Sequence, residues 1–129
     1  MARVSASGKL NIMLVEDHSL FRDALAFVLA REPDLEVVAK AGSLAEAREA
    51  LGGRRLDVAV VDLSLPDGDG TKLIEELRRS SPGVRVVVLS ATVSAGDAEE
   101  VLRAGADAVL DKVRSYSTIA EEVRRLADR

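Results

Sequence analysis

Five polar residues that could bind a metal or transfer a group each stand at the end of a short apolar run, although they lie far apart in the sequence. They are Glu16, Asp17, Asp62, Ser90 and Lys112. Carboxylates that are crowded together repel one another and retain protons unless a cation compensates their charge. A hard divalent ion with oxygen ligands, such as Mg²⁺, is the natural compensating cation. The three acids therefore predict a Mg²⁺ site, provided that the fold brings them together.

Asp62 is the candidate nucleophile of this group. An aspartate can form a covalent aspartyl phosphate, and phosphoryl transfer needs charge neutralisation and in-line positioning more than acid–base groups. Mg²⁺ and the Lys112 ammonium could neutralise the charge. The Ser90 hydroxyl and the backbone N–H groups after Asp62 could assist. The combination predicts phosphoryl transfer to Asp62.

Each of these residues also has an ordinary structural explanation. Acids that follow a strand often cap the next helix, which would account for Glu16 and Asp17 taken alone. Ser90 taken alone would be an ordinary loop residue, and Lys112 taken alone would be surface charge. The functional interpretation depends on the combination, because the carboxyl ends of parallel strands meet at one edge of a sheet, where ligands bind.

The elements that must position these residues alternate between short apolar runs and amphipathic stretches. The apolar residues of 20–29, for example, are spaced to form one face of a helix. Five strand–helix units in series imply right-handed crossovers and a parallel sheet with helices on both faces. The fold class is therefore α/β and doubly wound. The predicted strands are residues 10–15, 35–39, 57–61, 84–89 and 108–110.

Two of the predicted helices have informative ends. Ser43 has the pattern of an N-cap, with Glu46 three residues later completing a capping box, and the glycine pair 52–53 ends the helix. The fourth helix is expected to begin near residues 96–97. The small residues of 92–96 favour a short or mobile fourth helix.

Composition restricts the class of protein. A chain of 129 residues is expected to form one domain, here 10–128, after a flexible lead-in at 1–9 that lacks the apolar core of a signal peptide. The absence of cysteine excludes disulfides, thiolate metal sites and cysteine nucleophiles. A net charge of −4 argues against a nucleic-acid surface. No apolar run approaches the ~20 residues of a membrane span, so a cytoplasmic protein is expected.

The sequence resembles the receiver domains of bacterial two-component response regulators, most closely those of the NarL/FixJ type that are joined to LuxR-type DNA-binding domains. The motifs that carry the resemblance are IMLVEDHSLFRDALAFVL, DVAVVDLSLPDGDG, VVVLSA and AGADAVLDK, within a match from about Lys9 to Asp128. The resemblance implies a flavodoxin-like (βα)5 fold whose five parallel strands have the order 2-1-3-4-5.

The resemblance also implies roles for the residues at the strand ends. Asp62 matches the phospho-accepting aspartate. Asp17 matches a direct Mg²⁺ ligand, Glu16 its acidic neighbour that usually acts through a water, and Ser64 the residue whose main-chain carbonyl is a further ligand.

On the phosphate side, Ser90 matches the switch hydroxyl and Lys112 the lysine that pairs with the phosphoryl group. The implied donor is a sensor histidine kinase or a small acyl phosphate. The implied catalysis is limited to the domain's own phosphorylation and dephosphorylation, so the chain is not expected to be an enzyme otherwise. DNA would be bound only through an output domain absent from this sequence. A homodimer is a further expected partner.

Two other functions are consistent with parts of the sequence. Receivers commonly carry Tyr or Phe three residues before the lysine, where the ring moves with the switch hydroxyl, whereas this chain has Val109. A receiver-like protein-binding module that phosphorylation does not control is therefore the alternative. A phosphohydrolase with Asp62 as nucleophile is less consistent, because such enzymes usually carry a second acid where this chain has Ser64.

Overall fold

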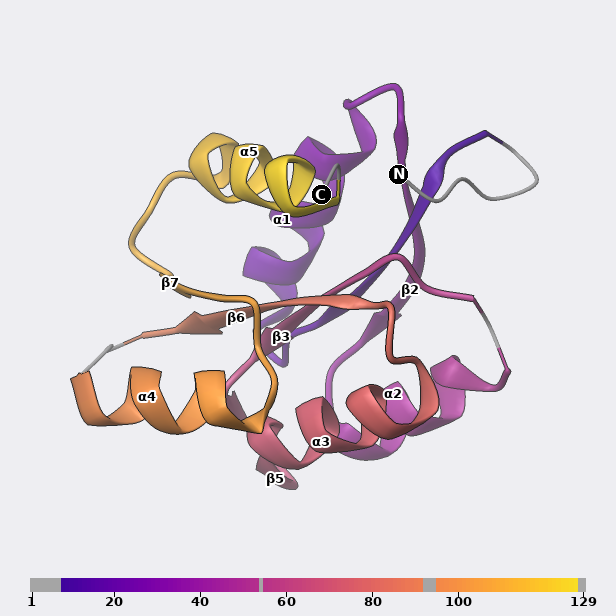
Figure 1. Ribbon diagram of the computed structural model, residues 1–129. Coiled ribbons are helices and arrows are strands. Elements are labelled where there is room, and N and C mark those ends of the chain that lie inside the picture. The colour runs from indigo at the N-terminus through magenta and orange to yellow at the C-terminus, as the bar shows by residue number, and fades with distance from the viewer. Residues whose placement is uncertain (1–7, 54, 92–94, 128–129) are drawn as a thin grey trace.

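A computed structural model describes residues 8–53, 55–91 and 95–127, and its centre is a five-stranded parallel sheet (Figure 1). The order of the strands is β2-β1-β3-β6-β7. When only the strands of this sheet are counted, this is the predicted order 2-1-3-4-5. The strands are β1 (Leu10–Val15), β2 (Leu35–Ala41), β3 (Val58–Asp62), β6 (Arg85–Ser90) and β7 (Ala108–Asp111).

Helices cover both faces of the sheet, as the doubly wound pattern predicts. In Figure 1, α1 and α5 lie on one face, and α2, α3 and α4 lie on the other. The helices are α1 (Ser19–Ala30), α2 (Leu44–Leu51), α3 (Gly70–Ser80), α4 (Ala95–Ala104) and α5 (Tyr116–Ala127).

The central strand β3 shows why the sequence forms this sheet. All of its residues are buried, as expected of a parallel strand that is covered on both faces. Successive side chains point to opposite faces. Val58 and Val60 therefore join the core under α1 and α5, whereas Ala59 and Val61 join the core under α2, α3 and α4.

A short antiparallel hairpin lies between β3 and α3, and the sequence did not predict it. Its strands, β4 (Ser64–Leu65) and β5 (Gly68–Asp69), have two residues each. Strands of this length are too short to show an alternating apolar pattern. The hairpin begins two residues after Asp62, one of the three acids of the predicted metal site.

The predicted ends of α2 are confirmed. The Ser43 side chain accepts a hydrogen bond from the Glu46 N–H at 3.1 Å, and Glu46 Oε1 accepts one from the Gly42 N–H at 2.7 Å. The glutamate thus reaches one residue further back than in a standard capping box. Gly52 ends the helix in the left-handed conformation, at φ 31°.

The fourth helix begins at Ala95, just before its predicted start, and has 10 residues. It is longer than the 8-residue α2 but shorter than α1, α3 and α5, so the expectation of a short or mobile fourth helix stays a prediction. Residues 92–94 of the segment expected to be mobile lie outside the described residues, as do residues 1–7 of the predicted lead-in.

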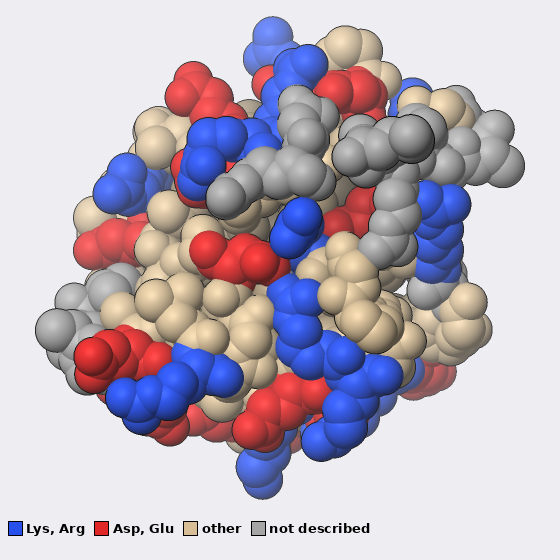
Figure 2. Space-filling model, viewed as in Figure 1, with Lys and Arg blue, Asp and Glu red and all other residues tan. Residues whose placement is uncertain are grey.

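The described helices are all too short or too polar to cross a membrane. On the face in Figure 2, Lys and Arg side chains alternate with Asp and Glu side chains.

Candidate functional site

The carboxyl ends of the strands bring the predicted acids together. Glu16 and Asp17 follow β1 directly, and Asp62 is the last residue of the neighbouring strand β3. One carboxylate oxygen from each of the three residues lies within 4.8 Å of the others. Glu16 and Asp62 are buried, whereas Asp17 is exposed. Two of the three acids are therefore enclosed by the protein, and the third is exposed to solvent.

Lys112 lies beside the two buried acids. Its Nζ is 2.8 Å from Glu16 Oε1 and 3.4 Å from Asp62 Oδ2. The backbone N–H of Lys112 donates to the Ser90 carbonyl at 2.9 Å, which extends the pairing of β7 with β6 by one residue. Backbone pairing thus sets the position from which the lysine side chain reaches the acids.

The buried setting changes the acidity of Asp62. Its exposed fraction is 4%. Burial raises the pKa of Asp62 to about 6, and the Glu16 carboxylate adds to the increase. The Ser64 N–H and the Lys112 ammonium act in the opposite direction but do not outweigh these effects. Burial also lowers the pKa of Lys112, but Glu16 and Asp62 more than compensate, so this pKa is raised. The lysine is therefore a stable positive charge.

The chain after Asp62 is held close to the acid. The Ser64 N–H donates to Asp62 Oδ1 at 3.1 Å. A Cβ atom on Gly70 would lie 2.5 Å from the Asp62 carbonyl oxygen, a distance that real Cβ atoms essentially never show. Glycine at position 70 therefore allows α3 to begin against the end of β3. The Ser64 side chain is exposed, and the role of the Ser64 carbonyl as a metal ligand stays a prediction.

Ser90 lies at the end of β6, next to β3 in the sheet, and it is buried. The pairing of the two strands continues past Asp62, because the Leu63 N–H donates to the Leu89 carbonyl at 3.0 Å. Ser90 is the residue directly after Leu89, and the Leu89 carbonyl is bonded to the chain just past Asp62. Its role as a switch hydroxyl stays a prediction.

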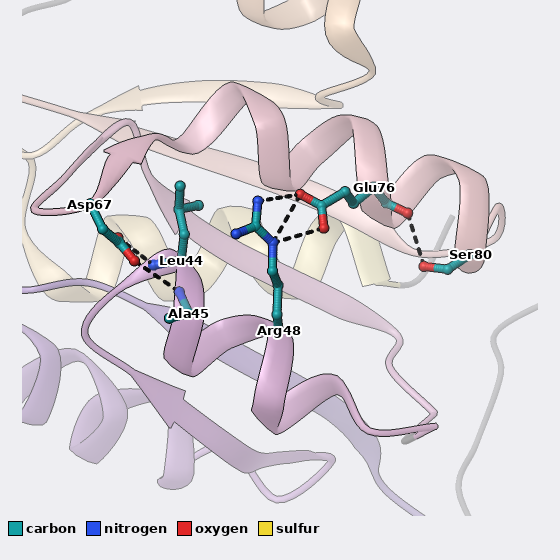
Figure 3. Close-up of polar contacts among 6 residues, drawn as sticks. All are labelled: Leu44, Ala45, Arg48, Asp67, Glu76 and Ser80. Carbon is teal, nitrogen blue, oxygen red and sulfur yellow. Dashed lines mark hydrogen bonds and ion pairs between the residues drawn. The ribbon is translucent and has the colours of Figure 1, made fainter.

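Asp67 has a structural contact that the sequence did not reveal. Its two carboxylate oxygens accept hydrogen bonds from the Leu44 and Ala45 N–H groups, at 2.8 and 3.0 Å (Figure 3). These N–H groups belong to the first turn of α2, where a negative charge is favourable. The contacts lower the pKa of Asp67. They tie the β4–β5 hairpin to α2, so the loop after Asp62 is held from a second side.

Two aromatic residues near Lys112 were not singled out from the sequence. Lys112 Nζ lies 4.8 Å from the centre of the Phe21 ring, and the Phe21 and Tyr116 rings meet edge to face with their centres 5.4 Å apart. Phe21 belongs to α1 and Tyr116 to α5. In the sequence, the only feature that could have drawn attention to these two residues is that the chain has few aromatic residues.

The chemistry of the acidic cluster fits a hard divalent cation. It offers carboxylate oxygens from three residues, and one of them is open to solvent and could leave room for waters. Glu16 Oε1 is buried and makes no hydrogen bond of ordinary geometry with the described residues, although it lies near Lys112. The arrangement can thus hold a cation beside Asp62, with a fixed ammonium nearby.

Comparisons with known proteins show which families and folds the chain is similar to. The family model of the response regulator receiver domain matches residues 12–124. One relative is the DNA-binding transcriptional activator DevR/DosR of Mycobacterium tuberculosis, 37% identical over 113 residues, which are 88% of this chain and 52% of that protein. The chain spans about half the length of the curated relatives it matches.

Solved structures have the same fold. The signal receiver domain of the response regulator NarL from Mycobacterium tuberculosis has a TM-score of 0.86 and 28% identity, over 93% of this chain and 97% of that one. A response regulator protein from Burkholderia pseudomallei, solved with a phosphorylated aspartic acid, calcium ion and citrate, has a TM-score of 0.82 and 28% identity. That match covers 93% of this chain and 69% of that one.

Proposed function

Because this chain belongs to the response regulator receiver domain family, we propose that it is switched by the transfer of a phosphoryl group to Asp62. One observation carries the assignment of the acceptor. Asp62 is the buried carboxylate at the end of the central strand that lies both within the three-acid cluster and 3.4 Å from the Lys112 ammonium. A nucleophile in phosphoryl transfer needs these neighbours, because charge neutralisation is the main contribution of the protein.

The proposed reaction is a direct displacement at phosphorus. An oxygen of the ionised Asp62 carboxylate forms a bond to the phosphorus atom. The bond from phosphorus to the donor breaks, and its electron pair leaves with the donor. The donor is the phosphohistidine of a sensor histidine kinase or an acyl phosphate. Lys112 offsets the negative charge of the transferred group, and the Ser64 N–H, which donates to Asp62 Oδ1, orients the carboxylate.

We further propose that Mg²⁺ is the cofactor. Asp17, Asp62 and the main-chain carbonyl of Ser64 would hold the ion directly, and Glu16 would act through a water. When bound, Mg²⁺ supplies positive charge to the phosphoryl oxygens. The carboxylate cluster supports this proposal, because three acids within 4.8 Å of one another favour a divalent cation.

The proposed output is control of transcription. The relative DevR/DosR is described as a DNA-binding transcriptional activator, and we propose that the present receiver controls a LuxR-type DNA-binding domain outside this sequence. In the proposed switch, Ser90 contacts the phosphoryl group, and the surface around α4, β7 and α5 changes. A homodimer through α1 and α5 or through α4 and α5 is a further proposal.

One observation favours the alternative function, a protein-binding module that phosphorylation does not control. Val109, at the position where related receivers commonly carry a ring, is half-buried and packs against the core under α2, α3 and α4. A packed valine cannot exchange between buried and exposed positions as an aromatic ring does. The alternative therefore differs from the first proposal in one respect, the response to a phosphoryl donor.

The deciding experiment is phosphorylation in vitro. The protein is incubated with acetyl phosphate or phosphoramidate, with and without Mg²⁺, and analysed by intact mass. One added phosphate is expected only with Mg²⁺, and it should be absent from Asp62→Ala. Asp23→Asn is the matched control, because Asp23 is an exposed acid of α1 outside the cluster. No adduct would favour the binding module, whereas a stoichiometric and persistent adduct excludes a phosphohydrolase.

A further inference from the structure

The contact between Phe21 and Tyr116 connects the helices α1 and α5 on one face of the sheet. Their rings meet edge to face, with an interplanar angle of 60° and centres 5.4 Å apart, a geometry that favours aromatic pairs. Phe21 is half-buried and packs against the core under α1 and α5. Tyr116 is 37% exposed, so the pair reaches from the core to the surface.

The inner member of this pair also contacts the proposed phosphorylation site. The Lys112 ammonium lies 4.8 Å from the centre of the Phe21 ring, within the range of a cation–π interaction. The same ammonium is bound to Glu16 and Asp62. The lysine side chain is thus shared between two carboxylates and one ring. A change in any of these attractions alters the balance that sets its position.

Phosphorylation of Asp62 would change this balance strongly. An aspartyl phosphate carries about −1.5 to −2 charges at neutral pH and three phosphoryl oxygens that accept hydrogen bonds, whereas the free Asp62 carboxylate carries one charge. The ammonium is then drawn toward the new oxygens. Because the Phe21 ring attracts the same ammonium more weakly, the contact between Lys112 and the ring is the one that changes.

We propose that Phe21 positions the Lys112 ammonium and transmits its displacement to Tyr116 at the α1–α5 surface when Asp62 is phosphorylated. This inference rests on the proposed function. The proposed path of the displacement does not pass through position 109, because Val109 packs against the core on the opposite face of the sheet.

The chain provides its own probe for this route. Tyr116 is its single tyrosine, and the chain has no tryptophan, so the tyrosine emission of the unmodified protein reports on one residue. The emission is recorded with Mg²⁺ alone and then after addition of acetyl phosphate, while the phosphorylated fraction is measured by intact mass in the same samples. We expect the emission to change in proportion to the phosphorylated fraction.

Two variants identify the path of the signal. Phe21→Leu keeps an apolar side chain but removes the ring, and it should abolish the emission change at every phosphorylated fraction that intact mass records, whatever the rate of phosphorylation. Phe27→Leu is the matched control, because Phe27 is the other phenylalanine of the chain, lies on the same helix and is exposed. It should keep the change. Circular dichroism establishes that both variants are folded.

The outcomes separate this inference from the proposed function. Complete phosphorylation with unchanged Tyr116 emission would overturn the inference and leave the function intact, and this result needs only the unmodified protein. An emission change that persists in Phe21→Leu would also overturn it, because the signal would then bypass the ring. If no phosphate is added at all, the proposed function fails, and the inference fails with it.

Discussion

The ammonium of Lys112 lies 2.8 Å from Oε1 of Glu16, a side chain with no exposed surface. This distance is shorter than the 3.4 Å that separates the same ammonium from Asp62. Before any phosphoryl group arrives, the lysine therefore compensates a buried acid. A buried charge without a partner is costly, so the residue proposed to act in phosphoryl transfer also contributes to stability.

Replacement of the lysine tests this double role. Lys112→Met should lower the free energy of unfolding in metal-free buffer at pH 7.5 by about 2–3 kcal/mol, because the Glu16 carboxylate loses its closest cation. Urea denaturation measures the change. The double variant Glu16→Gln with Lys112→Met should recover most of the loss. Lys72→Met, at an exposed position of α3, is the control and should change stability little; equal losses in both lysine variants would contradict the assignment.

The pKa of Asp62 predicts an unusual dependence of stability on pH. In the folded protein without metal this pKa is about 6, above the ordinary value of 3.8 for an aspartate. The folded state then binds more protons than the unfolded state between these values, so this carboxyl's contribution makes stability fall as the pH rises through the interval. Since a tenfold change in an acid constant corresponds to about 1.4 kcal/mol, the cost above pH 6 is at most about 3 kcal/mol.

Asp62→Asn removes this titration. In the presence of a chelator, the variant should be more stable than the unmodified protein at pH 7, and the difference should shrink as the pH falls from 6 to 4. Denaturation curves at a series of pH values provide the comparison. Parallel stability curves for the two proteins would show that Asp62 does not titrate in this range.

Binding of Mg²⁺ should stabilise the protein, because the ion requires the folded arrangement of the acids. A ligand at 100 times its dissociation constant stabilises the folded state by about 2.7 kcal/mol. Thermal unfolding with increasing Mg²⁺ should therefore show a rising midpoint, and Asp17→Asn should abolish most of the rise. Asp23→Asn again serves as the control outside the cluster. An equal Mg²⁺ response in both variants would argue against Asp17 as a ligand.

The close approach of Gly70 to β3 predicts a steric effect. In Gly70→Ala, the new Cβ would lie 2.5 Å from the Asp62 carbonyl oxygen, so the start of α3 or the end of β3 must move. We expect a loss of about 2 kcal/mol in stability and slower phosphorylation of Asp62. The neighbouring variant Thr71→Ala adds no atom near β3 and should leave both properties nearly unchanged. A neutral Gly70→Ala would show that the loop adapts freely.

Much of the fold and the candidate site was predictable from local patterns. Residues 58–61 of β3 are all apolar and are followed at once by Asp62, and parallel strands have their carboxyl ends at one edge. The predicted convergence of Glu16, Asp17 and Asp62 needed only this rule, and the structure confirms it. The capping pattern at Ser43 was equally local, because its partners lie within three residues.

The remaining features depend on how separate elements pack. Asp67 binds the first turn of α2, more than twenty residues earlier in the chain, and Phe21 of α1 meets Tyr116 of α5. The periodicity within one segment does not predict the distance between side chains of two helices. That distance depends on how each helix packs against the apolar core.

The sequence by itself thus determined which residues stand at the edge of the sheet and what chemistry their types allow. Only the tertiary structure decided how deeply Asp62 is buried, which acid lies closest to Lys112 and which ring attracts the same ammonium. The physical reason is that the strength of charge interactions depends on burial and on distances of a few ångströms, and both arise from packing between elements.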